Sequence, residues 1–367
     1  MKITCLNLSL QIASIRQELE KAIKKTIERR SFCLGPDVTD FEQQFARFCN
    51  VQYAVAVNSG TSALHLALRL LCIGPGDEVI TTPYTFAATS WAISYMGARP
   101  VYVDIEDPTF NIDAAKVEKA ITPKTKAILP VHLYGLPCEL SHLLKVANAH
   151  SLPLVEDAAQ AHGGIYHGSR VGSFGALSCF SFHPTKNLGA FGEGGALLTN
   201  DAALAARARL LREHGASRRY HHNEIGYNYR MEGLQAAVLC VKLKYLMAWI
   251  RGRRRVAELY SKMLADVPLR LPIEPQGHRS AWHLYTIRHP KRDQLKKFLL
   301  QRGIECSVHY PRPLHLQQCY TSLGYRVGDF PVAERASAEC LSLPIYPELT
   351  REQVEFVCTQ IRRFFFG

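Results

Sequence analysis

Between residues 53 and 200, short apolar runs alternate with stretches of helical periodicity, and this alternation constrains the fold more than any other feature of the chain. Buried strands are expected at residues 54–57, 78–81, 99–103, 127–131 and 152–156. Helices are expected between them, at residues 64–71, 87–96, 114–120 and 140–149. Such alternation is typical of βαβ units, so the sequence predicts an α/β fold with a mostly parallel sheet.

The rest of the chain frames this region. An amphipathic helix is predicted over residues 11–30, and Thr39 matches a helix-capping box ahead of an aromatic stripe that includes Phe41 and Phe45. A helical pattern from residue 232 to about 264 is followed by a mixed pattern of short elements. At 367 residues and 47% hydrophobic composition, the chain can bury more than one core. We expect a large α/β domain over residues 1–250 and a small C-terminal α+β domain over residues 251–367.

Composition also limits the cellular setting. The chain holds no apolar stretch long enough to span a membrane, and no secretory core follows Met1 and Lys2. Its eleven cysteines form no Cys-x-x-Cys pair, a pattern typical of reduced thiols. The sequence therefore predicts a cytoplasmic protein without a membrane partner.

The net charge of +12 raises the question of an anionic partner. We find no zinc knuckle, recognition helix or basic terminal arm, so nucleic acid is not the expected partner. Basic residues cluster at 218–219 and 251–255, and these clusters are either solvated surface or an attraction for an anionic substrate. His221 and His222 lack a third ligand at a suitable spacing, so no metal site is expected.

Two chemistry-bearing residues follow predicted strands. Lys186 lies just after an apolar run and just before the glycine-rich segment 189–195, and Asp157 closes the run that begins at residue 152. An amine that can form a Schiff base and a carboxylate that can hold a pyridinium nitrogen are the groups that pyridoxal 5'-phosphate requires. The alternatives are a surface lysine in a loop and an aspartate that caps a helix.

A third element fits a phosphate group. Residues 58–62, Asn-Ser-Gly-Thr-Ser, connect a predicted strand to a predicted helix, and backbone N–H groups at a helix start favour an anion. We expect Gly60, Thr61 and Ser181 to form a phosphate cup, although serine and threonine also cap helices without any ligand. Because ligands bind at the carboxyl ends of parallel strands, this turn and Asp157 are expected at one edge of the sheet.

Five segments in this order carry a family resemblance. They are residues 58–61, 83–86, 156–163, 178–189 and 228–231. Over nearly its whole length the chain resembles the DegT/DnrJ/EryC1/StrS sugar aminotransferases, which are pyridoxal phosphate enzymes of fold type I. The resemblance implies that Lys186 carries the cofactor and later moves a proton, and that Asp157 keeps the pyridine nitrogen protonated.

Further roles follow only from the resemblance. It implies that Gln160 lies near the phenolic oxygen of the cofactor and that Phe86 stacks on its ring, although plain core packing would also explain Phe86. It implies that Asn228 reaches the phosphate of the neighbouring subunit. The expected assembly is therefore a homodimer with shared active sites.

The C-terminal segments 309–315, 328–331 and 341–344 resemble the branch that aminates nucleotide-linked 3-keto-6-deoxyhexoses. The implied reaction transfers an amino group from an amino acid, usually L-glutamate, to C-3 of a dTDP-linked keto-deoxysugar. His309 and Tyr310 are expected to contact that sugar or its diphosphate. His183 is a third candidate for substrate binding, and its position is commonly tyrosine in this branch.

Two alternatives stay open, and a third is disfavoured. The enzyme could aminate C-4 of the sugar, or the fold could serve a regulatory or binding protein without catalysis. A sugar dehydratase of the same family is disfavoured, because the known dehydratases replace the Schiff-base lysine with histidine, whereas Lys186 is present.

Overall fold

The computed structural model describes residues 1–367, and a mixed β-sheet lies at its centre. One part of the sheet has the order β1 (Tyr53–Val57), β9 (Gly195–Thr199), β8 (Leu177–Ser181), β5 (Val155–Asp157). In the other part β2 (Glu78–Thr81) lies between β3 (Arg99–Tyr102) and β4 (Thr125–Ile128). Parallel bridges from Ile128 to Leu154 and from Val131 to Asp157 place β4 beside β5. The two parts therefore form one continuous layer.

The strand directions agree with the predicted α/β fold. β5 pairs parallel with β8, and β2 pairs parallel with both β3 and β4. β9 is antiparallel to both β8 and β1, so β1 runs in the same direction as β8 and β5. The predicted strand at residues 78–81 matches β2, while the predicted strand at 152–156 begins three residues early, because Pro153 precedes β5.

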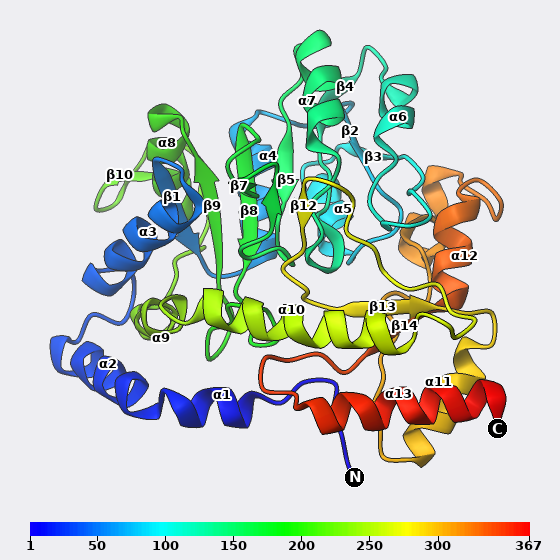
Figure 1. Cartoon of the computed structure of the whole chain (residues 1–367). Coiled ribbons are helices and arrows are strands. Elements are labelled where there is room, and N and C mark those ends of the chain that lie inside the picture. The colour runs from blue at the N-terminus through cyan, green and yellow to red at the C-terminus, as the bar shows by residue number, and fades with distance from the viewer.

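Helices connect the strands and cover the sheet. The connecting helices are α4 (Gly60–Leu70), α5 (Ala88–Tyr95), α6 (Ala114–Val117), α7 (Leu140–Ala149) and α8 (Ala202–Arg212). Leu64, Leu66 and Leu68 of α4 are buried in the core that α4 forms with β8 and β9. In Figure 1, α4 and α5 lie behind the strands and α3 (Pro36–Cys49) lies in front of β1, so both faces are covered.

The N-terminal region differs from its predicted form in two places. The single helix expected over residues 11–30 is two helices, α1 (Leu8–Ser14) and α2 (Arg16–Arg29), which meet at Ile15. Thr39 caps no helix, so the capping-box prediction is wrong. α3 begins three residues earlier, at Pro36, whose fixed φ suits the first helical position. Phe41 and Phe45 are fully buried, which confirms the aromatic stripe as core.

Short elements complete the chain. The remaining strands are β6 (Ile165–Tyr166), β7 (Ser169–Arg170), β10 (Ala216–Arg218), β11 (His221–His222) and β12 (His278–Arg279). Short 3₁₀ helices occur at η1 (Glu118–Ala120), η2 (Leu133–Gly135), η3 (Leu314–Leu316) and η4 (Gln318–Leu323).

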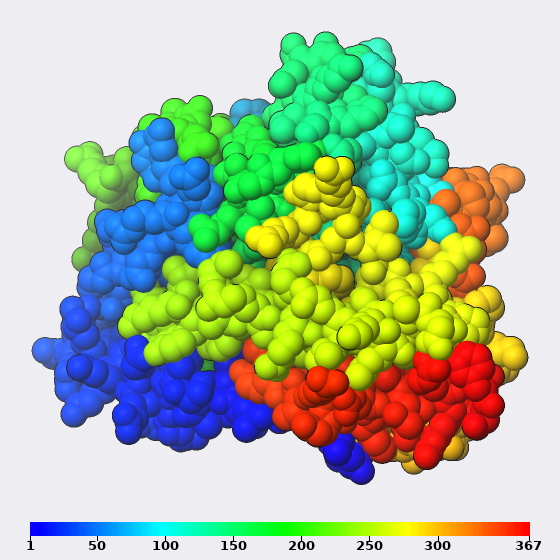
Figure 2. All heavy atoms as spheres, viewed as in Figure 1, coloured from blue at the N-terminus to red at the C-terminus, as the bar shows by residue number.

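A second hydrophobic core gathers the C-terminal elements. It is formed by α10 (Leu246–Met263), β13 (Tyr285–Arg288), α11 (Arg292–Gln301), β14 (Cys340–Leu343) and α13 (Arg351–Phe366). Ile3 joins this core, and Figure 2 shows the N-terminal segment against α13. α10 follows α9 (Gly233–Leu243) and contributes to two clusters, with Val256 in this C-terminal core and Ile250 in a separate cluster that includes Phe41 of α3. The domain boundary at residue 250 therefore falls within α10 and stays a prediction.

The basic cluster at residues 251–255 belongs to the framework of this second core. Arg253 is only 4% exposed and donates to the carbonyl groups of Trp282, His283 and Ile345. Arg254 forms a two-point ion pair with Glu274. The expectation of a solvated helix face is therefore wrong for these two arginines, because their guanidinium groups satisfy backbone and carboxylate acceptors inside the chain.

No single helix of the chain combines the length and the apolar composition that membrane crossing requires. α9 and α10 are long and apolar enough only when taken together, and the chain bends by 61° between them.

A cluster of charges joins the sheet to the C-terminal elements. Asp107, in the loop after β3, accepts hydrogen bonds from Arg288 and Arg335, both at 2.7 Å, and from Arg270. Nearby, Asp104 accepts from the first N–H groups of α12 (Pro331–Glu339). Partial burial alone would raise the pKa of Asp107, but the hydrogen bonds from Arg335 and Arg288 outweigh it and lower the pKa to about 2.

We expect Asp107→Asn to destabilise the protein by about 2 kcal/mol, because Arg288 is only 2% exposed and would lose one of its two anionic partners. A carboxylate with a depressed pKa stabilises the fold above its unfolded-state pKa of about 4 and loses that contribution on further acidification. The difference between wild type and variant in urea-unfolding free energy should therefore shrink from pH 4 towards pH 2. Asp266→Asn, which breaks an exposed pair with Arg362, is the control and should change stability much less.

Candidate functional site

The candidate site lies where three parallel strands end at one edge of the sheet. β1 leads into Ser59 and α4, β5 ends at Asp157, and β8 ends at Ser181. The helix start and the end of β8 touch directly, since a Cβ added to Gly60 would lie 2.6 Å from the Cβ of Ser181. Glycine is therefore required at position 60, and the predicted meeting of these segments is a feature of the structure.

Lys186 lies in a closed loop that follows β8. The N–H of Ala190 donates to the carbonyl of Phe182 at 2.8 Å, and the N–H of Phe182 donates to Gly194 at 2.7 Å. Within the loop, the N–H of Lys186 donates to the carbonyl of His183. Burial lowers the pKa of Lys186 to about 8, against the opposing charge of Asp157. Near neutral pH the amine is therefore unprotonated far more often than that of an ordinary lysine, as a nucleophile requires.

Asp157 is buried and held by two donors. The hydroxyl of Thr89, in the first turn of α5, donates to Oδ2 at 2.8 Å, and the N–H of Ala159 donates to Oδ1 at 3.2 Å. Burial raises the pKa of Asp157, while these hydrogen bonds and the charge of Lys186 oppose the rise. A carboxylate in this environment is well placed to bind a cationic N–H group.

The start of α4 has the donors that a phosphate group needs. Ser59 is the N-cap, and its hydroxyl accepts from the N–H of Ser62 at 3.0 Å. The cap therefore satisfies the third N–H of the helix, and the N–H groups of Gly60 and Thr61 have no intrahelical acceptor. Together with the adjacent hydroxyl of Ser181, they form a cradle that fits a phosphate.

Aromatic and amide groups border this edge. Phe86 is 52% exposed, so it is not a core residue, and its ring lies 6.2 Å from the ring of Tyr310. Gln160 is buried between two partners, accepting from the N–H of Tyr134 at 2.8 Å and donating to the hydroxyl of Tyr310 at 3.1 Å. Phe86, Gln160 and Tyr310 thus lie together, although they come from three distant parts of the chain.

His309 joins the site from the C-terminal part of the chain. Its Nδ1 is hydrogen-bonded to the hydroxyl of Ser342 at 3.0 Å, and its carbonyl accepts from the hydroxyls of Tyr84 and Tyr134. Burial, together with the charge of Lys186, lowers the pKa of His309 to about 4. His309 is therefore a neutral imidazole at neutral pH.

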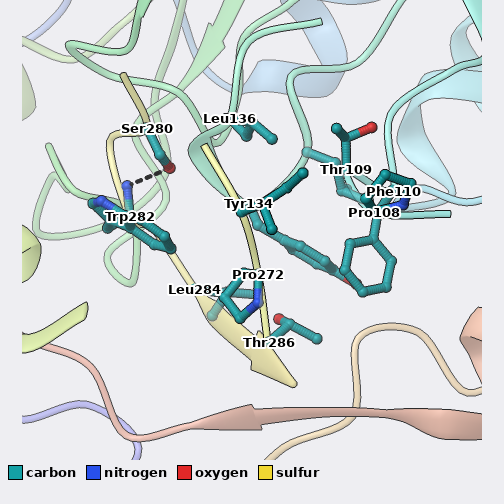
Figure 3. A pocket seen from close by; sticks show the side chains of 12 residues that line it. Pro108, Thr109, Phe110, Tyr134, Leu136, Pro272, Ser280, Trp282, Leu284 and Thr286 are labelled. Atoms are coloured by element: carbon teal, nitrogen blue, oxygen red, sulfur yellow. Dashed lines mark hydrogen bonds between the residues drawn. The ribbon is translucent and has the colours of Figure 1, made fainter. Parts of the chain in front are cut away.

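A small cavity of about 20 Å³ lies beside Tyr134, between the loop of Phe110 and the segment from Trp282 to Thr286 (Figure 3). This volume holds a water molecule at most. The cavity is too small for a cofactor or a sugar, so it is not the candidate site.

His183 lies at the start of the lysine loop with a defined tautomer. Its Nδ1 accepts from the N–H of Thr185 at 3.4 Å and lies 2.9 Å from the hydroxyl of the same residue. Because an N–H can only donate, Nδ1 is unprotonated, and the ring proton is on Nε2. His183 therefore presents one N–H donor beside Lys186.

Asn228 lies on the exposed side of the segment that follows β11. Its side-chain oxygen accepts from Arg230 at 2.9 Å, and its carbonyl accepts from Asn58. The amide nitrogen of Asn228 is left as a free donor in this exposed position. An exposed free N–H donor suits an anion. That this anion is the cofactor phosphate of the neighbouring subunit stays a prediction.

Two groups at the site were not identified from the sequence. Thr89 belongs to no motif, and only its contact with Asp157 reveals it. Glu156 lies in segment 156–163, and the sequence predicts no role for it, yet its fully buried carboxylate accepts five hydrogen bonds. The donors are the N–H groups of Gly172, Phe174 and Gly175, the hydroxyl of Ser178 and Nε2 of His132. In the sequence, the signal for a role of Glu156 is that a charged residue lies inside an otherwise apolar predicted strand.

The arrangement combines an amine of lowered pKa, a buried carboxylate, an exposed aromatic ring and an anion cradle. These are the groups that hold pyridoxal phosphate by its aldehyde, its pyridine nitrogen, its ring and its phosphate. The donor set therefore fits this cofactor. No group of three or more histidine, cysteine or acidic side chains is arranged to bind a metal ion.

Comparison with known proteins agrees with this chemistry. A sequence model of the DegT/DnrJ/EryC1/StrS aminotransferase family matches residues 13–362. The dTDP-3-amino-3,4,6-trideoxy-alpha-D-glucose transaminase of Streptomyces venezuelae is 43% identical over 364 residues, which cover 99% of this chain and 96% of the relative. A pleiotropic regulatory protein of Geobacillus stearothermophilus is 44% identical over 368 residues, covering 100% of this chain and 99% of that protein.

The fold is likewise similar to a solved structure. The crystal structure of DesV from S. venezuelae, in complex with a ketimine intermediate, superposes with a TM-score of 0.98 at 43% identity. The match covers 100% of this chain and 99% of DesV.

Proposed function

Because this chain belongs to the DegT/DnrJ/EryC1/StrS aminotransferase family, we propose that it aminates a nucleotide diphosphate-linked keto-deoxysugar. The chain is a sugar aminotransferase that depends on pyridoxal phosphate. The proposed acceptor is a dTDP-3-keto-6-deoxyhexose, aminated at C-3, and the proposed donor is L-glutamate. The proposed assembly is a homodimer with shared active sites.

One observation carries the chemistry of the proposal. Asp157 ends β5, the loop of Lys186 follows the paired strand β8, and the phosphate cradle at Gly60 lies against Ser181 at the same edge of the sheet. This grouping supports one shared site for an aldehyde, a pyridine nitrogen and a phosphate. A surface lysine or a simple helix cap would not bring these groups together.

When bound, pyridoxal phosphate supplies an aldehyde carbon that takes up and releases an amino group and a ring that withdraws electrons from the reacting carbon. Lys186 would hold the aldehyde through its neutral amine, and the same amine would remove and return the proton at the reacting carbon. Asp157 keeps a proton on the ring nitrogen, and Thr89 and Ala159 hold its carboxylate in place.

The surrounding residues orient and enclose the reacting groups. Gly60, Thr61 and Ser181 would bind the phosphate through N–H and hydroxyl donors, and Asn228 of the neighbouring subunit would be a further donor. Phe86 would cover one face of the ring, and Gln160, which donates to the hydroxyl of Tyr310, would lie near the phenolic oxygen. These contacts position the substrate carbon against the amine of Lys186.

The proposed substrate is supported by three observations. The S. venezuelae relative is named as a dTDP-3-amino-sugar transaminase. His309 is neutral and His183 carries its proton on Nε2, so both can hydrogen-bond sugar hydroxyls or phosphate oxygens. The net charge of +12 favours an anionic substrate in general.

A regulatory function is the second candidate, because the Geobacillus relative is named as a pleiotropic regulatory protein. A binding protein without catalysis needs no amine with a pKa of about 8 beside a buried carboxylate. The retained pair of Lys186 and Asp157 therefore favours catalysis.

We expect Lys186→Ala to abolish the visible absorbance of the cofactor-linked protein and to lower the transamination rate by at least about 100-fold. Asp157→Asn should fold normally and lose a similar factor, because a neutral amide does not keep the ring nitrogen protonated. Absorbance spectra and single-turnover kinetics measure both effects, and Lys126→Ala on the exposed side of β4 is the control. Near-normal turnover by either variant would contradict the assigned roles.

In the wild type, covalent capture of the cofactor by unloaded protein should accelerate as the pH rises through about 8, the pKa of Lys186.

Asn228→Asp tests the shared site. The variant keeps the contact with Arg230 but replaces the free N–H donor with a negative charge, so cofactor retention should fall at least about tenfold. Asn223→Asp, whose side chain contacts Ser217, is the control.

In an equal mixture of Asn228→Asp and Lys186→Ala with subunit exchange, half of the dimers are mixed, and each has one intact pocket. Activity should therefore recover to about a quarter of the wild-type value. If exchange is verified by mass spectrometry and no activity returns, the site belongs to one chain.

His183→Tyr tests substrate recognition, since it restores the side chain that is common at this position. The order of kcat/KM among nucleotide-linked keto-sugars should change, because tyrosine places a hydroxyl beyond the reach of the histidine N–H. Removing the nucleotide diphosphate from the substrate should raise KM sharply, and added salt should weaken binding. Equal activity on the free keto-sugar would overturn the proposed substrate class.

A further inference from the structure

A second buried lysine lies close behind the lysine loop. Lys242, near the C-terminal end of α9, is 2% exposed. Its Nζ donates to the carbonyl of Gly189 at 2.5 Å and lies 5.5 Å from the centre of the Phe191 ring. No carboxylate lies within ion-pair distance of Lys242, and burial lowers its pKa to about 8.

Gly189 is the point at which the lysine loop closes on itself. A Cβ at this position would lie 2.4 Å from the carbonyl oxygen of Pro184, so the two ends of the segment that holds Lys186 are in backbone contact. The neighbouring hydrogen bond from Ala190 to Phe182 completes the closure. The hydrogen bond from Lys242 therefore reaches the base of the loop, three residues from Lys186.

Two further contacts hold the same loop. The side-chain oxygen of Gln235, two turns before Lys242 on α9, accepts from the N–H of Phe191 at 2.9 Å. The amide of Asn187 donates to the carbonyl of Ala281 at 2.7 Å. The loop is thus fixed to α9 on one side and to the segment before β13 on the other.

A buried ammonium group without a counter-ion opposes folding. A methionine has nearly the same length and volume and lacks the charge, so packing alone does not explain a lysine at this position. The amine offers what methionine lacks, namely a donor for the carbonyl of Gly189 and a cation for the Phe191 ring. Both contacts act on the residues that follow Lys186.

We propose that Lys242 is a positioning residue, which holds the loop of Lys186 in its reactive geometry through the hydrogen bond to Gly189. This inference rests on the proposed role of Lys186 in carrying the cofactor. Lys242 itself does not touch the reacting atoms. It determines where the amine of Lys186 lies when that amine condenses with an aldehyde and one water molecule leaves.

The test uses the full-length chain freed of cofactor and measures its reaction with pyridoxal phosphate. Borohydride reduction and peptide mass spectrometry quantify the adduct at Lys186 over time. Lys242→Met removes the donor and keeps the volume, and it should slow the capture by at least about tenfold. Lys242→Arg keeps a cationic donor and should, where it folds, capture faster than Lys242→Met. Lys244→Met, which removes an exposed contact with Glu18, is the matched control and should behave as wild type.

The outcomes separate this inference from the proposed function. If wild type forms no adduct at Lys186, the proposed function itself fails. If wild type reacts and Lys242→Met reacts equally fast, or if folded Lys242→Arg is as slow as Lys242→Met, the positioning role is overturned. Thermal unfolding shows whether each variant is folded. If Lys242→Met does not unfold cooperatively, Lys242→Gln replaces it. The glutamine side chain is one bond shorter than that of lysine, so its amide does not reach the carbonyl of Gly189. Capture by this variant at the wild-type rate would again overturn the role.

Discussion

The candidate site depends on one buried carboxylate that no substrate would touch. Glu156 lies in β5, immediately before Asp157, and ties that strand to its surroundings through five donors. Burial alone would raise its pKa, but hydrogen bonds from His132 and the backbone lower it, so the group is an anion inside the protein. Since Nδ1 of His132 accepts from the N–H of Cys138, the imidazole is neutral and donates from Nε2. A fully satisfied buried anion of this kind fixes one backbone arrangement, because every alternative leaves a charge or a donor unpaired.

That arrangement sets the position of Asp157. The N–H of Asp157 donates to the carbonyl of Pro130, and its carbonyl accepts from the N–H of His132. The carboxylate of Glu156 accepts from the N–H groups of Gly172 and Gly175 and so holds that loop. The same carboxylate binds Ser178 in β8, the strand that leads to the lysine loop. The two strands that carry Asp157 and Lys186 are therefore held together by a group between them, in addition to their backbone pairing.

Local patterns in the sequence were sufficient for the existence and order of these strands and helices, although several bounds differ by two to four residues, as at β4 and the start of α4. β2 and α7 have the predicted bounds, because apolar runs of fixed length specify such elements directly. Capping signals predicted helix starts less well than apolar runs predicted whole elements. At Thr39 the capping box was wrong, because α3 begins at Pro36, three residues earlier. The family resemblance, and not periodicity, directed attention to Gln160 and Tyr310, whose hydrogen bond joins residues that are 150 positions apart.

The groups that sequence patterns missed act across such separations. Thr89 binds Asp157, Asp107 binds three arginines of the C-terminal elements, and Lys242 binds Gly189, each through a single side chain in an otherwise ordinary segment. A pattern within one segment reports which face of that segment is buried, but it does not report which polar partner waits there. Such partners nevertheless determine the chemistry, because they set which groups are charged and where they lie. The site thus consists of residues that local sequence identifies, held in place by residues that only the tertiary structure identifies.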